Sequence, residues 1–187
     1  KDRTSITEYV DDLAGLIDSQ DIKQKLLGLA RRDDLNHDIT LGDAVSAAPV
    51  VLGYIFQLRD DGLKKGAEKP LPASTIRILP QDVAYEDLVL ISGYRAILNI
   101  EEIAQSPTEG FLNVFPNTSG MVRKVPALME LDGIPYPSLA LEMVRTGLGE
   151  QDIVIHASSQ KTMNKNSILG VSLKDTFVPT DDMGQVT

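Results

Sequence analysis

The sequence predicts an α/β fold in which helices pack against a mixed β-sheet. Residues 50–56 are nearly continuous in apolar side chains, which is typical of a strand buried on both faces of a sheet. Residues 110–131 read as two extended stretches around a turn, which predicts a β-hairpin. Several other stretches repeat apolar residues at helical spacing. We therefore expect one domain over residues 1–187, with a central buried strand near residues 50–56 and a hairpin near residues 110–131.

The composition excludes several classes of protein. The chain has 187 residues, enough for one domain with a core of its own, and its net charge is −9. This acidity argues against a nucleic-acid partner and against docking on anionic lipid through a basic face. The absence of cysteine excludes disulfides and thiolate metal sites without identifying the compartment. The longest apolar region, residues 44–56, is shorter than the roughly 20 residues needed to span a bilayer.

The first fifty residues predict three helices. Residues 5–18 begin with a capping-box pattern at Ser5 and carry an apolar stripe, so a first helix is expected to end near residue 18. Residues 22–32 form a second amphipathic stretch that ends in two arginines. A third helix is expected over residues 38–48, with Asp38 as its cap and a proline directly after it.

The middle of the chain is less regular. Residues 58–72 are rich in charge, glycine and proline, and we interpret them as an exposed loop. Residues 75–79 are expected to form an extended edge segment. Residues 83–91 are ambiguous between strand and helix. Apolar residues at helical spacing over residues 97–104 predict a helix that leads into the hairpin.

Residues 110–141 hold three structural signals in uninterrupted order. Residues 111–115 predict a short strand, and residues 117–120, Asn-Thr-Ser-Gly, supply the turn. Residues 121–131 alternate as a return strand until Asp132-Gly133 turns the chain again.

A helix is expected next. Pro135 and Pro137 favour an extended entry, Ser138 is a suitable cap, and Gly147 and Gly149 are expected to end the helix. The apolar face predicted from helical spacing consists of Leu139, Ala140, Met143, Val144 and Leu148.

This stretch resembles the second type of CHASE domain, the cyclase/histidine-kinase-associated sensory extracellular domain of bacterial membrane receptors. The resemblance covers a Gly-Phe-apolar-Asn strand, a Gly-centred turn, a Val-Arg-x-Val-Pro return strand, Asp-Gly, and Tyr-Pro-Ser-Leu-Ala. In this chain these are residues 110–113, Gly120, residues 122–126, residues 132–133 and residues 136–140. Members of the family more often have Asp in the turn where this chain has Asn117 and Ser119.

The resemblance implies an extracytoplasmic sensory module of a bacterial transmembrane receptor. Such a module relays the binding of a small molecule or protein signal to a cytoplasmic cyclase or kinase output domain. Residues 1–5 and 38–53 look like neighbouring parts of the family pattern, which would make the helices between them an insertion. The chain would then be an internal fragment, without the family's N-terminal strands, C-terminal part and transmembrane helices. The resemblance implies no catalytic activity and no cofactor in this segment. It implies membrane association only through the missing helices. Whether the domain forms a homodimer stays open.

The C-terminal part predicts further extended structure. Residues 153–155 predict a short strand, and residues 158–166 a polar connection. Residues 168–178 suggest another strand with Gly170 inside it. Residues 179–184 are expected to form a hairpin turn whose second strand lies beyond the end of the chain.

No catalytic or metal motif stands out. His37 and His156 are the only histidines, and neither has the neighbours of a zinc or iron site. We interpret His156 as a satisfied polar residue at a strand end, although imidazole chemistry would allow a pH response. Asp181-Asp182 with Gly184 faintly resembles a calcium loop, but a turn is the better account.

Ligand-binding residues are not identifiable from the sequence. Arg95, Arg123 and Arg145 would hold an anionic ligand if they converged, but separate surface arginines are the default expectation. Two alternatives to a sensor stay open. One is an α/β hydrolase-like enzyme with a scattered site, which His156 lying near a serine and an aspartate would favour. The other is a structural interaction domain with a large apolar patch.

Overall fold

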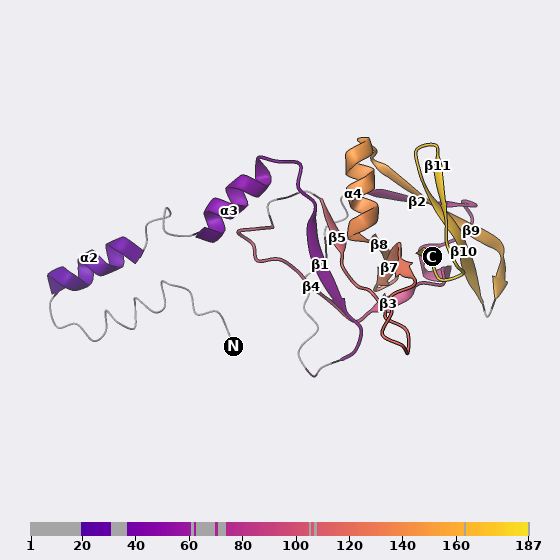
Figure 1. Cartoon of the computed structure of the whole chain (residues 1–187), viewed down its shortest axis with the longest axis horizontal. Helices are drawn as coiled ribbons and strands as arrows, with labels where there is room; N and C mark the ends of the chain where they lie inside the picture. Colours follow the sequence, from indigo (N-terminus) through magenta and orange to yellow (C-terminus); the bar gives the residue numbers. More distant parts are fainter. Residues whose placement is uncertain are drawn as a thin grey trace.

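The computed structural model describes residues 20–30, 37–60, 62, 70, 74–104, 106, 108–162 and 164–186. Strands predominate in this part of the chain, with fewer helices than an α/β pattern suggests. The helices are α2 (Gln20–Ala30), α3 (His37–Ser46) and α4 (Leu139–Leu148), with a short 3₁₀ turn, η2 (Tyr85–Asp87). Figure 1 shows α2 and α3 to one side of the sheets and α4 against them.

The predicted second and third helices are confirmed by α2 and α3. Asp38 lies in the first turn of α3 rather than before it, and only Gly42 and Val45 are buried there. The predicted first helix and most of the predicted loop at residues 58–72 lie outside the described residues. Within that loop Leu58 is exposed, whereas Pro70 is buried.

A first sheet, the β1 sheet, has the order β4-β1-β5. Its central strand β1 (Leu52–Gln57) runs antiparallel to β4 (Arg95–Ile97) and parallel to β5 (Glu109–Phe111). A second sheet, the β7 sheet, has the order β3-β7-β8, built from β3 (Ile91–Gly93), β7 (Leu128–Leu131) and β8 (Ile134–Pro137).

A third sheet, the β9 sheet, has the order β11-β10-β9-β2. Strands β9 (Asp152–Thr162), β10 (Lys165–Leu173) and β11 (Thr176–Pro179) form an antiparallel meander, and β2 (Thr75–Leu79) joins its edge parallel to β9. The edge strand expected at residues 75–79 is therefore confirmed. A two-stranded ribbon pairs β6 (Val125–Pro126) with β12 (Gln185–Val186).

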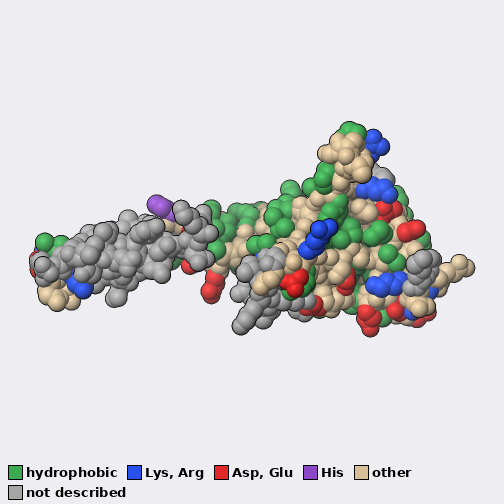
Figure 2. Space-filling view, turned by 90° about the horizontal axis from the view of Figure 1, so that it is seen from below, with side chains coloured by type: hydrophobic (Ala, Val, Ile, Leu, Met, Phe, Trp, Pro, Cys, Tyr) green, Lys and Arg blue, Asp and Glu red, His purple; other side chains and the backbone are tan. Residues whose placement is uncertain are grey.

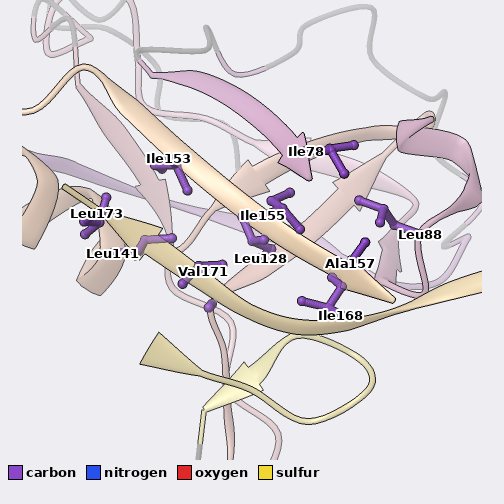
Figure 3. Packing of buried hydrophobic residues seen from close by; sticks show 11 residues of the cluster. Ile78, Leu88, Leu128, Leu141, Ile153, Ile155, Ala157, Ile168, Val171 and Leu173 are labelled. Carbon is purple, nitrogen blue, oxygen red and sulfur yellow. The ribbon is translucent and has the colours of Figure 1, made fainter. Parts of the chain in front are cut away.

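Two hydrophobic cores meet at β7. Leu128 belongs to the core beneath the β9 sheet, where it packs with Ile155 and Val171; Figure 3 shows these side chains converging from β7, β9 and β10. Met129 and Leu131 belong to the other core, which lies against the β1 sheet. The period of two along a strand sends neighbouring side chains to opposite faces, so β7 supplies both cores.

The central strand at residues 50–56 is present as β1, but it is buried on only one face. Tyr54 and Phe56 point into the second core and are at most 3% exposed. Ile55, between them, is 48% exposed, as is its register partner Ile97 at 49%. The expectation of a strand covered on both faces is therefore wrong for the described residues.

The predicted hairpin over residues 110–131 is also wrong, although its turn forms. Asn117 closes the turn: its backbone N donates to Met121 O at 2.8 Å, and its side-chain Oδ1 accepts from Ser119 N at 3.0 Å. No described ladder joins the two arms. β5 pairs instead with β1, and Asn113 extends that contact by bonding Phe56 N at 2.8 Å and Phe56 O at 2.7 Å through its side chain.

The hairpin lies one turn further on, between β7 and β8. Asp132 and Gly133 have φ of 52° and 78°, the positive values that a tight hairpin turn requires. Glu130 Oε2 accepts a hydrogen bond from Gly133 N at 2.8 Å and so stabilises this turn. The turns predicted at residues 117–120 and at Asp132-Gly133 both form, but only the Asp132-Gly133 turn joins two strands that pair with each other.

Helix α4 is confirmed, with the predicted cap at Ser138 and the predicted end at Gly149, whereas Gly147, also expected to end it, lies inside the helix. Ser138 Oγ accepts from Leu141 N at 3.3 Å, and Gly149 ends the helix in the left-handed region with φ of 69°. The predicted apolar face is wrong. Met143 is 57% exposed and Val144 53%, whereas the buried positions include a carboxylate and a guanidinium.

Four further predictions need correction. Residues 95–97 form β4, and only a short turn around Ile100–Ala104 follows, with Ala104 N donating to Ile100 O at 2.9 Å. Residues 158–162 continue β9 rather than forming a connection, and residues 168–178 divide into β10 and β11 at Lys174. The turn at residues 179–184 forms, but the strand after it, β12, pairs with β6. The ambiguous residues 83–91 contain η2 and the start of β3.

Candidate functional site

The outer face of the β9 sheet carries polar side chains on adjacent strands. Strand alternation sends Ile153 and Ile155 into the core and leaves Val154 and His156 on the opposite face. In the register, Val154 is the partner of Arg77 on β2 and of Ser172 on β10. These positions therefore form one continuous row across the sheet.

His156 and Ser172 form a hydrogen-bonded pair on this face. The distance between His156 Nε2 and Ser172 Oγ is 2.7 Å, and the imidazole meets the ring of Phe177 edge-on at 5.2 Å between centroids. His156 lies inside β9, so its predicted place at a strand end is wrong. No sequence motif points to Ser172, because cross-strand pairing brings together two residues that form no local motif.

A cleft opens beside this row, between β2 and residues 81–86. Its volume is about 520 Å³. Its apolar lining comes from Ile78, Leu79, Val83, Ala84 and Val154. Its polar lining comes from Arg77, Gln81, Tyr85 and Glu86. Leu79 is the register partner of His156, so this side chain of the cleft lies on the same sheet face as the His156–Ser172 pair.

The walls of the cleft are fixed by hydrogen bonds and packing. Tyr85 Oη donates to Ile76 O on β2 at 2.5 Å, which ties η2 to the edge strand. Val83 packs against the core beneath the β9 sheet. Arg77 forms an ion pair with Asp152, which lies two residues before Val154 on β9. The lining of the cleft thus combines apolar side chains with one cationic side chain, Arg77, and one anionic side chain, Glu86.

A second polar cluster is buried beneath α4. Arg145 Nη2 and Nε donate to Glu142 Oε2 at 2.7 and 2.9 Å, and Nη1 donates to Glu150 O at 2.5 Å. Glu142 is 0% exposed and Arg145 4%. Glu142 Oε1 and Tyr54 Oη are buried without a hydrogen-bond partner among the described residues. Burial, aided by the nearby Tyr136, Glu109 and Glu142, raises the pKa of Tyr54, so its phenol stays neutral.

The three arginines considered for an anionic ligand have different surroundings. Arg95 on β4 donates to Gln57 Oε1 at 2.6 Å, and Arg123 lies in the exposed stretch before β6. Arg145 is buried in its ion pair, so the default expectation of a surface position is wrong for it.

The carboxylate of Asp181 holds the turn at residues 179–184. Its Oδ1 accepts from Met183 N at 3.1 Å and Gln185 N at 2.9 Å, and its Oδ2 accepts from Lys124 Nζ at 2.9 Å. Partial burial opposes ionisation of Asp181, but Lys124 and the two backbone N–H groups outweigh it and lower the pKa. These contacts fit a turn. No group of three metal-ligating side chains occurs in the part of the chain that the structure describes, and His37 starts α3.

Comparison with known proteins returns no match: no family model, no curated protein and no solved structure resembles this chain significantly. Among the described helices, none has the length and hydrophobicity needed to cross a membrane. The resemblance to the second type of CHASE domain therefore remains a prediction that depends on the motif residues alone.

Proposed function

We propose that this chain is a sensory module that binds a small-molecule signal in the cleft between β2 and residues 81–86. The observation that carries the proposal is the cleft itself, because its volume of about 520 Å³ falls within the range typical of small-molecule sites. Its lining also combines apolar side chains with a few polar groups, as in such sites. The motif over residues 110–140 supports the wider assignment to the extracytoplasmic part of a bacterial receptor with an α/β CHASE-type fold.

A ligand in the cleft would contact the core beneath the β9 sheet. Ile78 lines the cleft and is also a member of the core beneath the β9 sheet. A ligand shifts a conformational equilibrium only by its differential affinity for the two states. Contacts to the ligand that form in only one of the two states would supply that difference.

A thermal-shift screen of metabolites tests the binding function. A ligand present at a hundredfold excess over its dissociation constant is expected to stabilise the fold by about 2.7 kcal/mol. Ala84→Phe, which places a large side chain in the cleft, is expected to remove the shift. Thr118→Phe, on the exposed turn, is the matched control and should retain it. No stabilisation by any metabolite, or an equal shift in Ala84→Phe, would contradict the proposal.

The receptor assignment is tested separately by the rest of the open reading frame. Transmembrane helices and a cyclase or kinase domain after this segment would support it. A full-length product without such helices would contradict extracytoplasmic anchoring while leaving ligand binding in the cleft intact.

A second candidate function is ester or amide hydrolysis, which the 2.7 Å contact between His156 Nε2 and Ser172 Oγ favours. In this mechanism Ser172 Oγ would attack the carbonyl carbon while its proton passes to Nε2. Protonated Nε2 would then give this proton to the departing alcohol or amine, leaving an acyl-serine, and water activated by neutral Nε2 would hydrolyse the acyl-serine and return the proton to Ser172 Oγ. No Asp or Glu contact to the imidazole appears among the described contacts, so the proposal concerns a dyad rather than a triad.

Labelling with a fluorophosphonate, together with hydrolysis of p-nitrophenyl acetate, tests this candidate. A functional dyad predicts that the label attaches to Ser172 and that Ser172→Ala and His156→Ala abolish both signals. Ser158→Ala is the control, because Ser158 lies on the same strand face but its Oγ contacts Gln160 N at 3.1 Å. Absence of labelling at Ser172 in the intact protein would exclude the hydrolase.

A further inference from the structure

The two ionic side chains of the cleft have opposite charges and come from different walls. Arg77 projects from β2, and Glu86 belongs to η2 on the facing segment. The same cleft is also lined by the apolar side chains of Leu79, Val83 and Val154. From this arrangement, and assuming the proposed binding function, we propose that the cleft takes a free α-amino acid with an apolar side chain, carboxylate toward Arg77 and ammonium toward Glu86.

The apolar lining of the cleft favours a hydrophobic side chain on the ligand. Leu79, on the edge strand β2, is 43% exposed. Covering such surface gains roughly 25 cal/mol per Å² of apolar area removed from water. A branched aliphatic side chain would cover Leu79 and Val154 without leaving a polar group unpaired.

The present partner of Arg77 does not prevent this role. Its ion pair with Asp152 joins side chains that are 64% and 33% exposed. Ion pairs with this much exposure to solvent contribute little to stability, so a ligand carboxylate can compete for the guanidinium or share it. Arginine also presents paired N–H donors that match a carboxylate in bidentate fashion.

Long-range electrostatics favour a zwitterion over a simple anion. The chain carries a net charge of −9, which repels anions approaching from solution. An amino acid at neutral pH has no net charge and avoids this repulsion, yet its two ends still pair with Arg77 and Glu86. A simple carboxylate gains only one of these contacts.

Isothermal titration with leucine, N-acetyl-leucine and leucinamide tests the ligand class. Leucine is expected to bind at least tenfold more tightly than either derivative, because each derivative lacks one charge. Arg77→Gln should reduce leucine to the affinity of leucinamide, and Glu86→Gln should reduce it to that of N-acetyl-leucine. Arg123→Gln and Glu102→Gln, which change exposed residues outside the cleft, are the matched controls and should bind leucine like the parent chain.

The outcomes separate this inference from the proposed function. Equal binding of leucine and its two derivatives would overturn the inference, as would unchanged leucine binding in both cleft variants. If another metabolite stabilises the chain and Ala84→Phe removes that shift, the sensory function stands while the amino-acid inference fails. If neither leucine nor any other metabolite binds, both are overturned.

Discussion

Replacing Arg145 by alanine is expected to destabilise the fold by about 3–5 kcal/mol, because it leaves Glu142 as an unpaired buried carboxylate. The substitution also removes the hydrogen bond from Arg145 Nη1 to Glu150 O, which holds the chain after α4. Urea unfolding followed by circular dichroism measures the change. The expected effect exceeds that of removing a surface ion pair, because a buried charge has no water to solvate it.

Two further variants identify the cause of this loss. The double variant Glu142→Leu/Arg145→Met removes both charges and should recover most of the stability, since buried ion pairs and apolar pairs of similar volume are often nearly equivalent. Lys174→Ala breaks an exposed ion pair with Glu150 at 3.6 Å and should cost at most about 1 kcal/mol. If Arg145→Ala cost no more than Lys174→Ala, the buried position of the pair would be refuted.

Gly110→Ala is expected to destabilise the fold by about 2–3 kcal/mol through a steric clash with the main chain. A Cβ at position 110 would lie 2.5 Å from Leu139 Cα and 2.6 Å from Leu139 N. These atoms belong to the first turn of α4, so they cannot move aside as a flexible side chain would. Thermal unfolding measures the change through a lower Tm.

Gly147→Ala is the matched control for this prediction. Gly147 lies inside α4, and a Cβ added there meets nothing within 4 Å. Alanine at this position should stabilise the helix by roughly 0.5–1 kcal/mol, because it restricts the unfolded chain and favours the helix. A stabilising effect of Gly110→Ala would contradict the close packing of β5 against α4.

Local signals predicted the elements whose ends are determined by neighbouring residues. Ser138 and Gly149 identify both ends of α4, since capping depends on residues within one turn of the helix. Asp132-Gly133 identifies the β7–β8 turn for the same reason. Val50 to Phe56 predicted a strand, and β1 is there. In each case the signal and the structure it specifies are adjacent in sequence.

Strand partners and buried faces were not predictable in this way. Asn117 forms its turn, but its two arms find partners elsewhere, which turn chemistry cannot reveal. Helical spacing predicted that Met143 and Val144 are buried, because a periodicity argument assigns charged residues to the exposed face of a helix. Glu142 and Arg145 neutralise one another three residues apart, so they occupy the buried face instead. Ile55 is exposed because no described element covers that face of β1.

The candidate site shows the same limit. His156 attracted interest from the sequence because it is one of two histidines. Ser172 and Leu79 become its neighbours only through the pairing of β10 and β2 with β9, and that register depends on the whole sheet. Glu86 and the cleft it lines depend on the path of residues 81–86, for which the sequence offered only an ambiguous segment.

The position of β7 limits how this fold can change shape. Sliding this strand by one residue would turn Leu128 away from Ile155 and direct Glu130 toward the aromatic side chains around Phe56. Both cores would lose their packing in the same step, so neither can be rearranged alone by strand slippage. A motion that preserves the fold must therefore move β7, the β1 sheet and the β9 sheet together as one unit. Changes in backbone conformation would then be confined to the segments that connect these strands.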